Sequence, residues 1–478
     1  MAETAATPST PAAPRPAGEP RAARPASARD VLHDADAYAR ALMDYVVASP
    51  SSYHAAAEAA RRLDAVGFTA VDEISPWGIA TPQCGYTIRD GAIAAWVLPE
   101  AARDGSAFRI VGSHTDSPAL KLKPSAQATR DGFALIGAEV YGGPLLNSFL
   151  DRELGLAGRL VTRDGASHLV RTGPIARVAQ VAPHLDRSVN DSLHLDRQAH
   201  LAPIWGLTGQ AGETGEAGAP AAPADVEAYL CETAGIDVGE LAGHDILTYP
   251  TEAPARFGRH AEFIASSRLD NLSSVAASLA ALESLCGGSG KRAATSAGAA
   301  TGDVVVLIAN DHEEVGSGTR SGAAGPFLEQ VLRRLAGALT ITGDAYEAML
   351  ARSTCISADA AHSLHPNYAQ LHDPVVRPVL GDGPVLKINA QQRYATDAVG
   401  EALWERACAA AGAPHQVFVS NNAVPCGTTI GPITAQRLGI TTVDVGQPIL
   451  SMHSQREMCA VADGPWLAQA LAAYWAGA

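Results

Sequence analysis

The chain has 478 residues, of which 47 % are hydrophobic and 18 % are charged, so it is long enough for a large globular domain and a second module. Acidic residues outnumber basic ones by 50 to 35, and the net charge of −15 argues against a nucleic-acid partner and against an anionic membrane surface. No run of about 18 apolar residues occurs, so the sequence predicts no membrane span.

Cysteine usage points to a reducing compartment. The seven cysteines are an odd number and include no Cys-x-x-Cys pair, so neither a disulfide framework nor a thiolate zinc site is predicted. We therefore expect reduced thiols in a cytoplasmic protein. Residues 1–28 are rich in Ala and Pro and lack a continuous apolar stretch, so we expect a disordered tail and no secretory signal.

Hydrophobic periodicity predicts the elements in chain order. Helices are expected over 34–49 and 53–68, followed by strands over 92–98 and 108–113. Over 118–250 the texture changes to short strands separated by turns, such as FALIGAEVY and RLVTR. Apolar strands and amphipathic helices then alternate again, which is typical of a mostly parallel sheet covered by helices.

These patterns predict the domain organisation. We expect one α/β domain built from residues 29–117 and 251–478, interrupted by a separate β-rich domain over 118–250.

The most unusual stretch is IANDHEEVGS, Ile308 to Ser317, at the end of a strand-like apolar run. Packing gives no reason to place two adjacent glutamates there, because like charges raise each other's pKa and cost stability. Other metal-type ligands also follow predicted strands or open a predicted helix. These are His114 and Asp116 in VGSHTDSP, Asp270 in SSRLDNLSS, Asp359 in STCISADAAHS and His453 in VDVGQPILSMHSQREM. Open α/β sheets place their ligand crevice at the carboxyl ends of strands.

This set of residue types suits a two-metal hydrolytic site. Each divalent ion takes a mixture of imidazole and carboxylate and keeps a position open for water or substrate. One carboxylate can bridge two ions roughly 3.5–4 Å apart, and a water between them is acidified enough to attack a carbonyl. A carboxylate beside the ligands can then take the proton. The glutamate pair fits this division, with one glutamate on metal and its neighbour moving the proton.

Each residue taken singly also has a structural interpretation. Asp270 precedes a helical run and could be its N-cap, His114 could be a core histidine, and Asp116 could cap a turn. The shared position of the set at strand ends favours the joint interpretation as a site.

At these residues the sequence resembles the M18 metallopeptidase family, the aspartyl aminopeptidases. The family's motifs are matched in order by GSHTDSP, SSRLDNL, NDHEEVGS, SADAAHSLHPNY, KINAQQRYA, PCGTTIGP and SMHSQREM, and the resemblance covers nearly the whole chain after the tail. The resemblance implies a zinc-peptidase α/β/α sandwich with an inserted β-rich dimerisation domain. It also implies cleavage of the N-terminal residue of short peptides, with a preference for Asp or Glu.

The resemblance further implies two Zn²⁺ ions per subunit, with Mn²⁺ or Co²⁺ as substitutes because nitrogen and oxygen ligands accept all three. One ion would be held by His114, Asp270 and Asp359, and the other by Asp270, Glu314 and His453. Asp270 would therefore be the bridging carboxylate.

The remaining roles also come from the resemblance. Glu313 would be the general base, and Asp116 would orient His114 through its far nitrogen. Lys387 and Tyr394 match positions that hold the side-chain carboxylate of the substrate. His362 would line the same pocket or steady the substrate backbone. A surface lysine is normally solvated, but Lys387 lies in the apolar run VLKI, which argues against that alternative.

The family assembles as dimers built into a dodecamer, so a homo-oligomer is expected. His184 matches a histidine that the partner subunit inserts into the neighbouring active site. Two other functions stay open at this point: a neutral-residue, Leu-type metalloaminopeptidase or an amidohydrolase of acylated amino acids, and a non-catalytic oligomeric scaffold. A buried ammonium at Lys387 would argue against a neutral pocket, and an intact ligand set argues against a scaffold.

Overall fold

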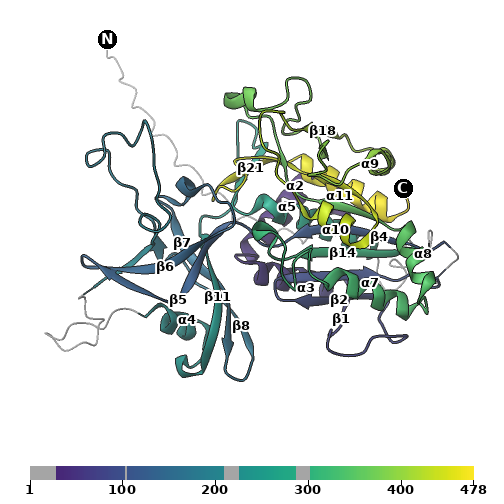
Figure 1. Ribbon diagram of the computed structural model, residues 1–478, viewed down its shortest axis with the longest axis horizontal. Coiled ribbons are helices and arrows are strands. Elements are labelled where there is room, and N and C mark those ends of the chain that lie inside the picture. The colour runs from purple at the N-terminus through teal and green to yellow at the C-terminus, as the bar shows by residue number, and fades with distance from the viewer. Residues whose placement is uncertain (1–27, 103–104, 209–224, 287–301) are drawn as a thin grey trace, which may run out of the picture.

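The computed structural model describes residues 28–102, 105–208, 225–286 and 302–478. The expected tail over residues 1–28 lies outside these ranges except for Ala28, which begins helix α1 (Ala28–His33). Figure 1 shows two lobes side by side, one built on a helix-covered sheet and the other on β-strands. None of the helices in the described ranges has the length and hydropathy of a membrane-spanning segment.

The larger lobe is organised around a nine-stranded sheet in the order β1–β2–β3–β14–β4–β15–β19–β17–β18. Its four central strands, β14, β4, β15 and β19, run parallel, and antiparallel pairs flank them on both sides. The strands are β1 (Thr69–Ala70), β2 (Cys84–Arg89), β3 (Ala92–Val97), β14 (Val304–Asn310), β4 (Phe108–His114), β15 (Thr354–Ala358), β19 (Thr441–Gly446), β17 (Val385–Ile388) and β18 (Gln416–Val419).

Helices cover both faces of this sheet, because its central strands are apolar on both sides. In β14 all seven residues are buried; Val305 and Leu307 face one core and Val304 and Val306 face the other. The first face carries α2 (Ala35–Ala48), α3 (Ser52–Ala65), α5 (Leu269–Cys286), α9 (Ala398–Ala411) and α11 (Asp463–Trp475). The second carries α7 (Phe327–Ala338), α8 (Asp344–Arg352) and α10 (Ile430–Leu438).

The smaller lobe is a closed β-barrel with its own core. Its sheet runs β11–β5–β6–β10–β9–β7–β8, and a further pairing of β11 with β7 closes it. The elements are β5 (Ala119–Arg130), β6 (Phe133–Tyr141), η1 (Leu146–Phe149), β7 (Glu153–Thr162), β8 (Ser167–Arg171), β9 (Ala176–Arg177), β10 (Ile204–Leu207), α4 (Val226–Ala234), η2 (Val238–Glu240) and β11 (Leu241–Pro250). The barrel core includes Leu120, Ile136, Leu156 and, from α4, Leu230. The predicted fold class, an α/β/α sandwich with a β-rich insertion, is confirmed.

A third, five-stranded sheet was not expected from the sequence. It consists of β12 (Ala255–Phe257), β13 (Phe263–Ser266), β21 (Glu457–Ala460), β20 (Pro448–Leu450) and β16 (Ala361–His362). Its short strands pair segments from three distant parts of the chain. The sheet thereby brings the start of α5 and the turn after β20 to the edge where the central strands end.

Candidate metal centre

The central parallel strands deliver four of the predicted residues to one edge of the sheet. β4 ends at His114, Asp359 follows β15, and Glu313 and Glu314 lie in the short 3₁₀ helix η3 (Glu313–Val315) after β14. β14, β4 and β15 are parallel neighbours, so their carboxyl ends meet at this edge.

The third sheet delivers the other two. Pairing of β13 with β21 places Asp270 at the start of α5, and pairing of β20 with β21 places the turn that carries His453. Asp270 has φ −81° and ψ 106°, so its backbone is not helical, and the Asp270–Asn271 peptide bond is cis. Among the hydrogen bonds of the described residues, none is donated by a helix N–H to the Asp270 carboxylate, whose two oxygens face the two histidines instead.

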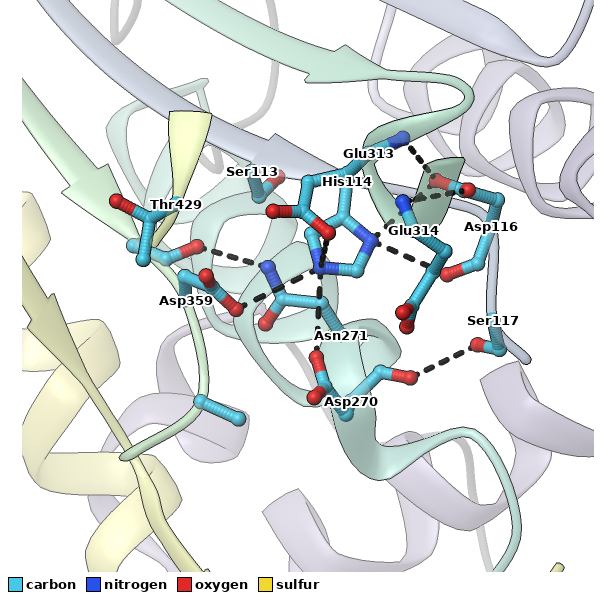
Figure 2. Close-up of polar contacts among 12 residues, drawn as sticks. Ser113, His114, Asp116, Ser117, Asp270, Asn271, Glu313, Glu314, Asp359 and Thr429 are labelled. Carbon is cyan, nitrogen blue, oxygen red and sulfur yellow. Dashed lines mark hydrogen bonds and ion pairs between the residues drawn. The ribbon is translucent and has the colours of Figure 1, made fainter. Parts of the chain in front are cut away.

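Asp270 lies between the two imidazoles and presents one oxygen to each. Its Oδ1 is 3.3 Å from His114 Nε2 and its Oδ2 is 3.6 Å from His453 Nε2. His114 Nε2 is also 3.5 Å from Asp359 Oδ1, and His453 Nε2 is 3.5 Å from Glu314 Oε2. Figure 2 shows His114 at the centre of its group, with Asp359 and Asp270 converging on the same nitrogen.

The chemistry of these donors fits divalent metal ions. Ligand atoms of His114, Asp270 and Glu314 all lie within 4.8 Å of one another. Asp270 Oδ1 and Glu314 Oε1 are buried without a hydrogen-bond partner, which is costly for a carboxylate unless a cation compensates it. Burial and the nearby Asp270 carboxylate raise the pKa of Glu314, another sign of excess negative charge that a metal ion would neutralise.

Both histidines present the nitrogen that a metal needs. His114 Nδ1 lies 3.1 Å from the backbone carbonyl of Asp116, and His453 Nδ1 lies 2.9 Å from that of Gly143. A carbonyl oxygen only accepts, so each Nδ1 carries the proton and donates it. Each Nε2 therefore keeps its lone pair, directed into the carboxylate cluster.

Asp116 contacts the η3 turn, Tyr141 and His114. Its carboxylate accepts the backbone N–H groups of Glu313 at 3.0 Å and Glu314 at 3.2 Å, and the hydroxyl of Tyr141 at 2.7 Å. Its Oδ1 is also 3.4 Å from His114 Nδ1. Burial opposes ionisation, but His114 and these donors outweigh it and lower the pKa of Asp116. Asp116 thus caps the η3 turn and at the same time braces His114.

The two glutamates of η3 occupy different environments. The Glu314 side chain is 4 % exposed and faces His453, whereas that of Glu313 is 15 % exposed, with Oε2 4.0 Å from His114 Nε2. Burial raises the pKa of Glu313 to about 8, an effect that His114 opposes and the Asp359 carboxylate adds to. Glu313 is therefore the carboxylate with room to exchange a proton beside the cluster.

A cavity of about 230 Å³ lies next to the cluster and is lined by His362 and Tyr394 together with Phe418 and His372. Lys387 is not among the lining residues and is 1 % exposed, so the solvated-lysine alternative is wrong. The Lys387 ammonium donates to the carbonyls of Asp359 at 2.9 Å and Ala360 at 3.2 Å. It also lies 5.1 Å from the centre of the Tyr394 ring and 3.7 Å from Asp359 Oδ2.

His184 is the one predicted site residue that this single chain does not bring to the cluster. It is exposed in the barrel segment between β9 and β10. No hydrogen bond or ion pair found among the described residues joins it to the metal cluster.

Sequence reasoning missed the groups that hold the ligands in place. Glu457 is 2 % exposed, and its two carboxylate oxygens accept the backbone N–H of His453 at 2.8 Å and of Asp270 at 3.0 Å. Its only signal was its position in the motif SMHSQREM. Nothing in the sequence indicated that Tyr141 belongs to the site, because it is the last residue of a strand-like apolar run. Ser117 was not predicted either, although its hydroxyl donates to the Asp270 carbonyl at 2.8 Å (Figure 2).

Comparisons with known proteins agree with this geometry. The model of the family described as aminopeptidase I zinc metalloprotease (M18) matches residues 45–475. A probable M18 family aminopeptidase 2 of Streptomyces avermitilis is 48 % identical over 91 % of this chain and 97 % of its own length. A relative with the same description from Pseudomonas aeruginosa PAO1 is 39 % identical over 91 % of this chain and 97 % of its own length.

Solved structures give the same answer for the fold. A chain in the cryo-EM structure of the Ape4 and Nbr1 complex has a TM-score of 0.84 and 31 % identity, covering 93 % of this chain and 86 % of its own. Yeast aminopeptidase 1 has a TM-score of 0.76 and 26 % identity, covering 93 % and 98 %. The chain therefore belongs to the M18 family of zinc metallopeptidases and is a metalloaminopeptidase.

Proposed function

We propose that this protein is a dinuclear zinc aminopeptidase that prefers an acidic residue, Asp or Glu, at the N-terminus of short peptides. The observation that carries the dinuclear assignment is the position of Asp270, whose two oxygens face His114 on one side and His453 on the other. A single-metal site would not need a carboxylate shared between two imidazoles.

The ligand sets follow from the nearest donors. One ion would be held by His114, Asp270 and Asp359, and the second by Asp270, Glu314 and His453. Zinc suits these mixed nitrogen and oxygen sets, and manganese or cobalt would also be accepted. Two divalent ions bound here would acidify a water molecule and polarise the scissile carbonyl.

Glu313 is the residue we assign to proton transfer. It is the more exposed carboxylate of η3 and lies beside, not within, the closest ligand contacts. In this role its carboxylate takes the proton of the attacking water and passes it to the leaving amine. The backbone N–H of Glu313 is held by Asp116 at 3.0 Å, so the side chain starts from a fixed position.

The acidic preference rests on Lys387. An ammonium has three N–H donors, and two of those of Lys387 already bond the carbonyls of Asp359 and Ala360. The ammonium lies 5.1 Å from the centre of the ring of Tyr394, which lines the cavity, and we assign the third donor to a substrate carboxylate bound there. The apolar lining of the same cavity, which includes Leu371, Phe418 and Val424, keeps a neutral-residue aminopeptidase as the second candidate.

We further propose that the chain forms a homo-oligomer through the barrel, with dimers built into a dodecamer, and that His184 completes the active site of a neighbouring subunit. A solved relative is described as an mApe1 dodecamer; it is 26 % identical, with a TM-score of 0.76, and covers 92 % of this chain. Apolar side chains near His184 are exposed in the single chain, Leu185 by 83 % and Val181 by 43 %, as expected for a surface that a partner covers. None of the described cysteines forms a disulfide within the chain, in keeping with the proposed cytoplasmic location.

The test is cleavage of aspartyl-, glutamyl- and leucyl-chromogenic substrates by metal-stripped protein before and after zinc, manganese or cobalt is added. Metal-restored cleavage that favours the acidic substrates supports the proposal. Restored cleavage of the leucyl substrate alone would keep the metal site and overturn the acidic pocket. Full activity of the stripped protein would overturn the metal assignment itself.

A further inference from the structure

One short segment of the barrel contacts the residues of the metal cluster. The Tyr141–Leu145 segment has the sequence YGGPL and leaves the barrel at the end of β6. The Tyr141 hydroxyl donates to Asp116 Oδ2 at 2.7 Å. Gly143 accepts the Nδ1 proton of His453 at 2.9 Å, and the Leu145 N–H donates to the His453 carbonyl at 3.0 Å.

Gly142 allows the backbone of this segment to lie directly against Glu314. Gly142 has φ +73°, and a Cβ placed on it would be 3.1 Å from Glu314 Cβ and 3.4 Å from the Glu314 carbonyl. A Cβ on Gly143 would be 3.6 Å from His453 Nδ1, which is an ordinary van der Waals contact. A side chain at position 142 would therefore be strained twice, by its backbone conformation and by contact with Glu314.

The segment thereby acts on both histidines of the cluster. It fixes the Nδ1–H tautomer of His453 directly through Gly143. It acts on His114 indirectly, because Tyr141 anchors the Asp116 carboxylate that lies 3.4 Å from His114 Nδ1. Groups that orient ligating histidines in this way raise metal affinity.

We propose that the Tyr141–Leu145 segment is a positioning element of the metal centre, so that metal retention depends on how the barrel is seated on the catalytic domain. The barrel then has a role inside each subunit in addition to any role between subunits. This inference rests on the proposed metal assignment. In chemical terms, Tyr141 is a hydrogen-bond donor to Asp116. The Gly142–Gly143 backbone packs against Glu314 and accepts the hydrogen bond of His453.

Tyr141→Phe tests the hydrogen bond without adding an atom. Its matched control is Tyr86→Phe, which removes a tyrosine donor to another aspartate, Asp64, at 2.9 Å on the catalytic domain. Zinc affinity is measured on the full-length oligomer by competition with a chromophoric chelator. We expect Tyr141→Phe to weaken zinc binding by about 10–100-fold and the control to leave it unchanged.

The visible spectrum of the cobalt-substituted protein gives a second readout, because it reports ligand geometry and not overall stability. We expect band positions to shift in Tyr141→Phe and to stay fixed in Tyr86→Phe. Wild-type zinc affinity together with a wild-type cobalt spectrum in Tyr141→Phe would overturn the proposal. Failure of the wild-type protein to bind zinc would instead overturn the proposed function, so the two failures are distinguishable.

Gly142→Ala tests the close approach to Glu314. Its control is Gly132→Ala in the β5–β6 turn, where φ is +87° but a Cβ would meet nothing within 4 Å. Both variants carry the same kind of backbone strain, and only the first presses on a ligand. We expect Gly142→Ala to release one zinc ion at a chelator concentration that Gly132→Ala withstands. Equal zinc retention by the two would overturn the proposal; if Gly142→Ala fails to fold, the Tyr141→Phe comparison decides.

Discussion

Glu313 and Glu314 are adjacent in sequence, yet their side chains point to different tasks. The nearly buried Glu314 faces His453, and Glu313 keeps some exposure beside His114. The 3₁₀ turn of η3 separates them, because it directs consecutive side chains to different sides of the short helix. The two backbone N–H groups, in contrast, converge on the single carboxylate of Asp116.

Glu313→Gln is expected to keep both metal ions and lose turnover. The amide has the size of the carboxylate but accepts no proton, so kcat falls by about 10²–10⁴-fold. Zinc content by elemental analysis should stay at the wild-type value. Near-normal kcat in a variant with full zinc occupancy would remove Glu313 as the base.

Asp270→Asn and Asp359→Asn form a matched pair that tests the bridge. Each replaces a buried carboxylate by an amide of the same shape, but only Asp270 faces both histidines. We expect Asp359→Asn to retain about one zinc ion per subunit and Asp270→Asn to lose most of both. Equal zinc content in the two variants would contradict the bridging role.

Lys387→Met tests the specificity pocket, because Met keeps most of the aliphatic stem and removes the charge. The kcat/KM ratio of aspartyl to leucyl substrates should fall by about 100-fold, as a carboxylate would lose its buried cation. The leucyl substrate is the internal control, since Lys387 also contacts Asp359 and its loss can disturb the cluster in general. An unchanged ratio would place the selecting cation elsewhere.

At the scale of elements, the sequence predicted the long helices and the strands that are buried on both faces of the sheet. The apolar runs of β14 and β15 were visible because central parallel strands are buried on both faces. Strand-end positions then indicated most of the candidate metal ligands. The third sheet could not be predicted, because strands such as the two-residue β16 are too short to show a period. Glu457 was missed for a related reason: it acts by accepting backbone N–H groups, which leave no mark on side-chain patterns.

The contact between β7 and the β2–β3 turn gives a prediction about docking of the barrel. Arg159 on β7 pairs with Asp90 of the turn at 2.8 Å and with Asp245 at 3.0 Å, and its guanidinium lies 4.6 Å from the centre of the Tyr53 ring. Asp90 also pairs with Arg320 at 2.7 Å. Burial opposes ionisation of Asp90, but the two arginines outweigh it and lower its pKa from 3.8 to about 2.

Asp90→Asn is therefore expected to destabilise the protein in a pH-dependent way. A carboxyl whose pKa is lower in the folded state stabilises the fold above its unfolded pKa, and this contribution is lost as the pH falls through the folded value. The variant should be about 1–2 kcal/mol less stable near pH 6, allowing for solvent screening, and the difference should vanish between pH 4 and 2. Asn tolerates the left-handed backbone of this residue, φ 55°, so strain is not added. Thermal unfolding of both proteins between pH 6 and pH 2 measures this stability difference. A difference that does not change with pH would contradict the role of the Asp90 carboxylate.

At the scale of the whole molecule, the single chain leaves His184 apart from any metal cluster. The sequence could predict that this histidine matters only through the family resemblance, because a residue that acts across an interface has no partner within its own chain. The exposed apolar residues beside it, Val181 and Leu185, suit the proposal that a partner subunit covers this part of the barrel. If so, His184 and Glu313 of one chain serve different active sites.

Mixed oligomers test this arrangement directly. His184→Ala and Glu313→Gln are each expected to be nearly inactive, and both should assemble normally. When the two are dissociated, mixed and reassembled, half of the randomly formed dimers pair one variant with the other, and each such dimer holds one site with both Glu313 and His184. Activity should therefore return to about a quarter of the wild-type value. If His184 served the site of its own chain, every site in the mixture would lack one residue, and no activity would return.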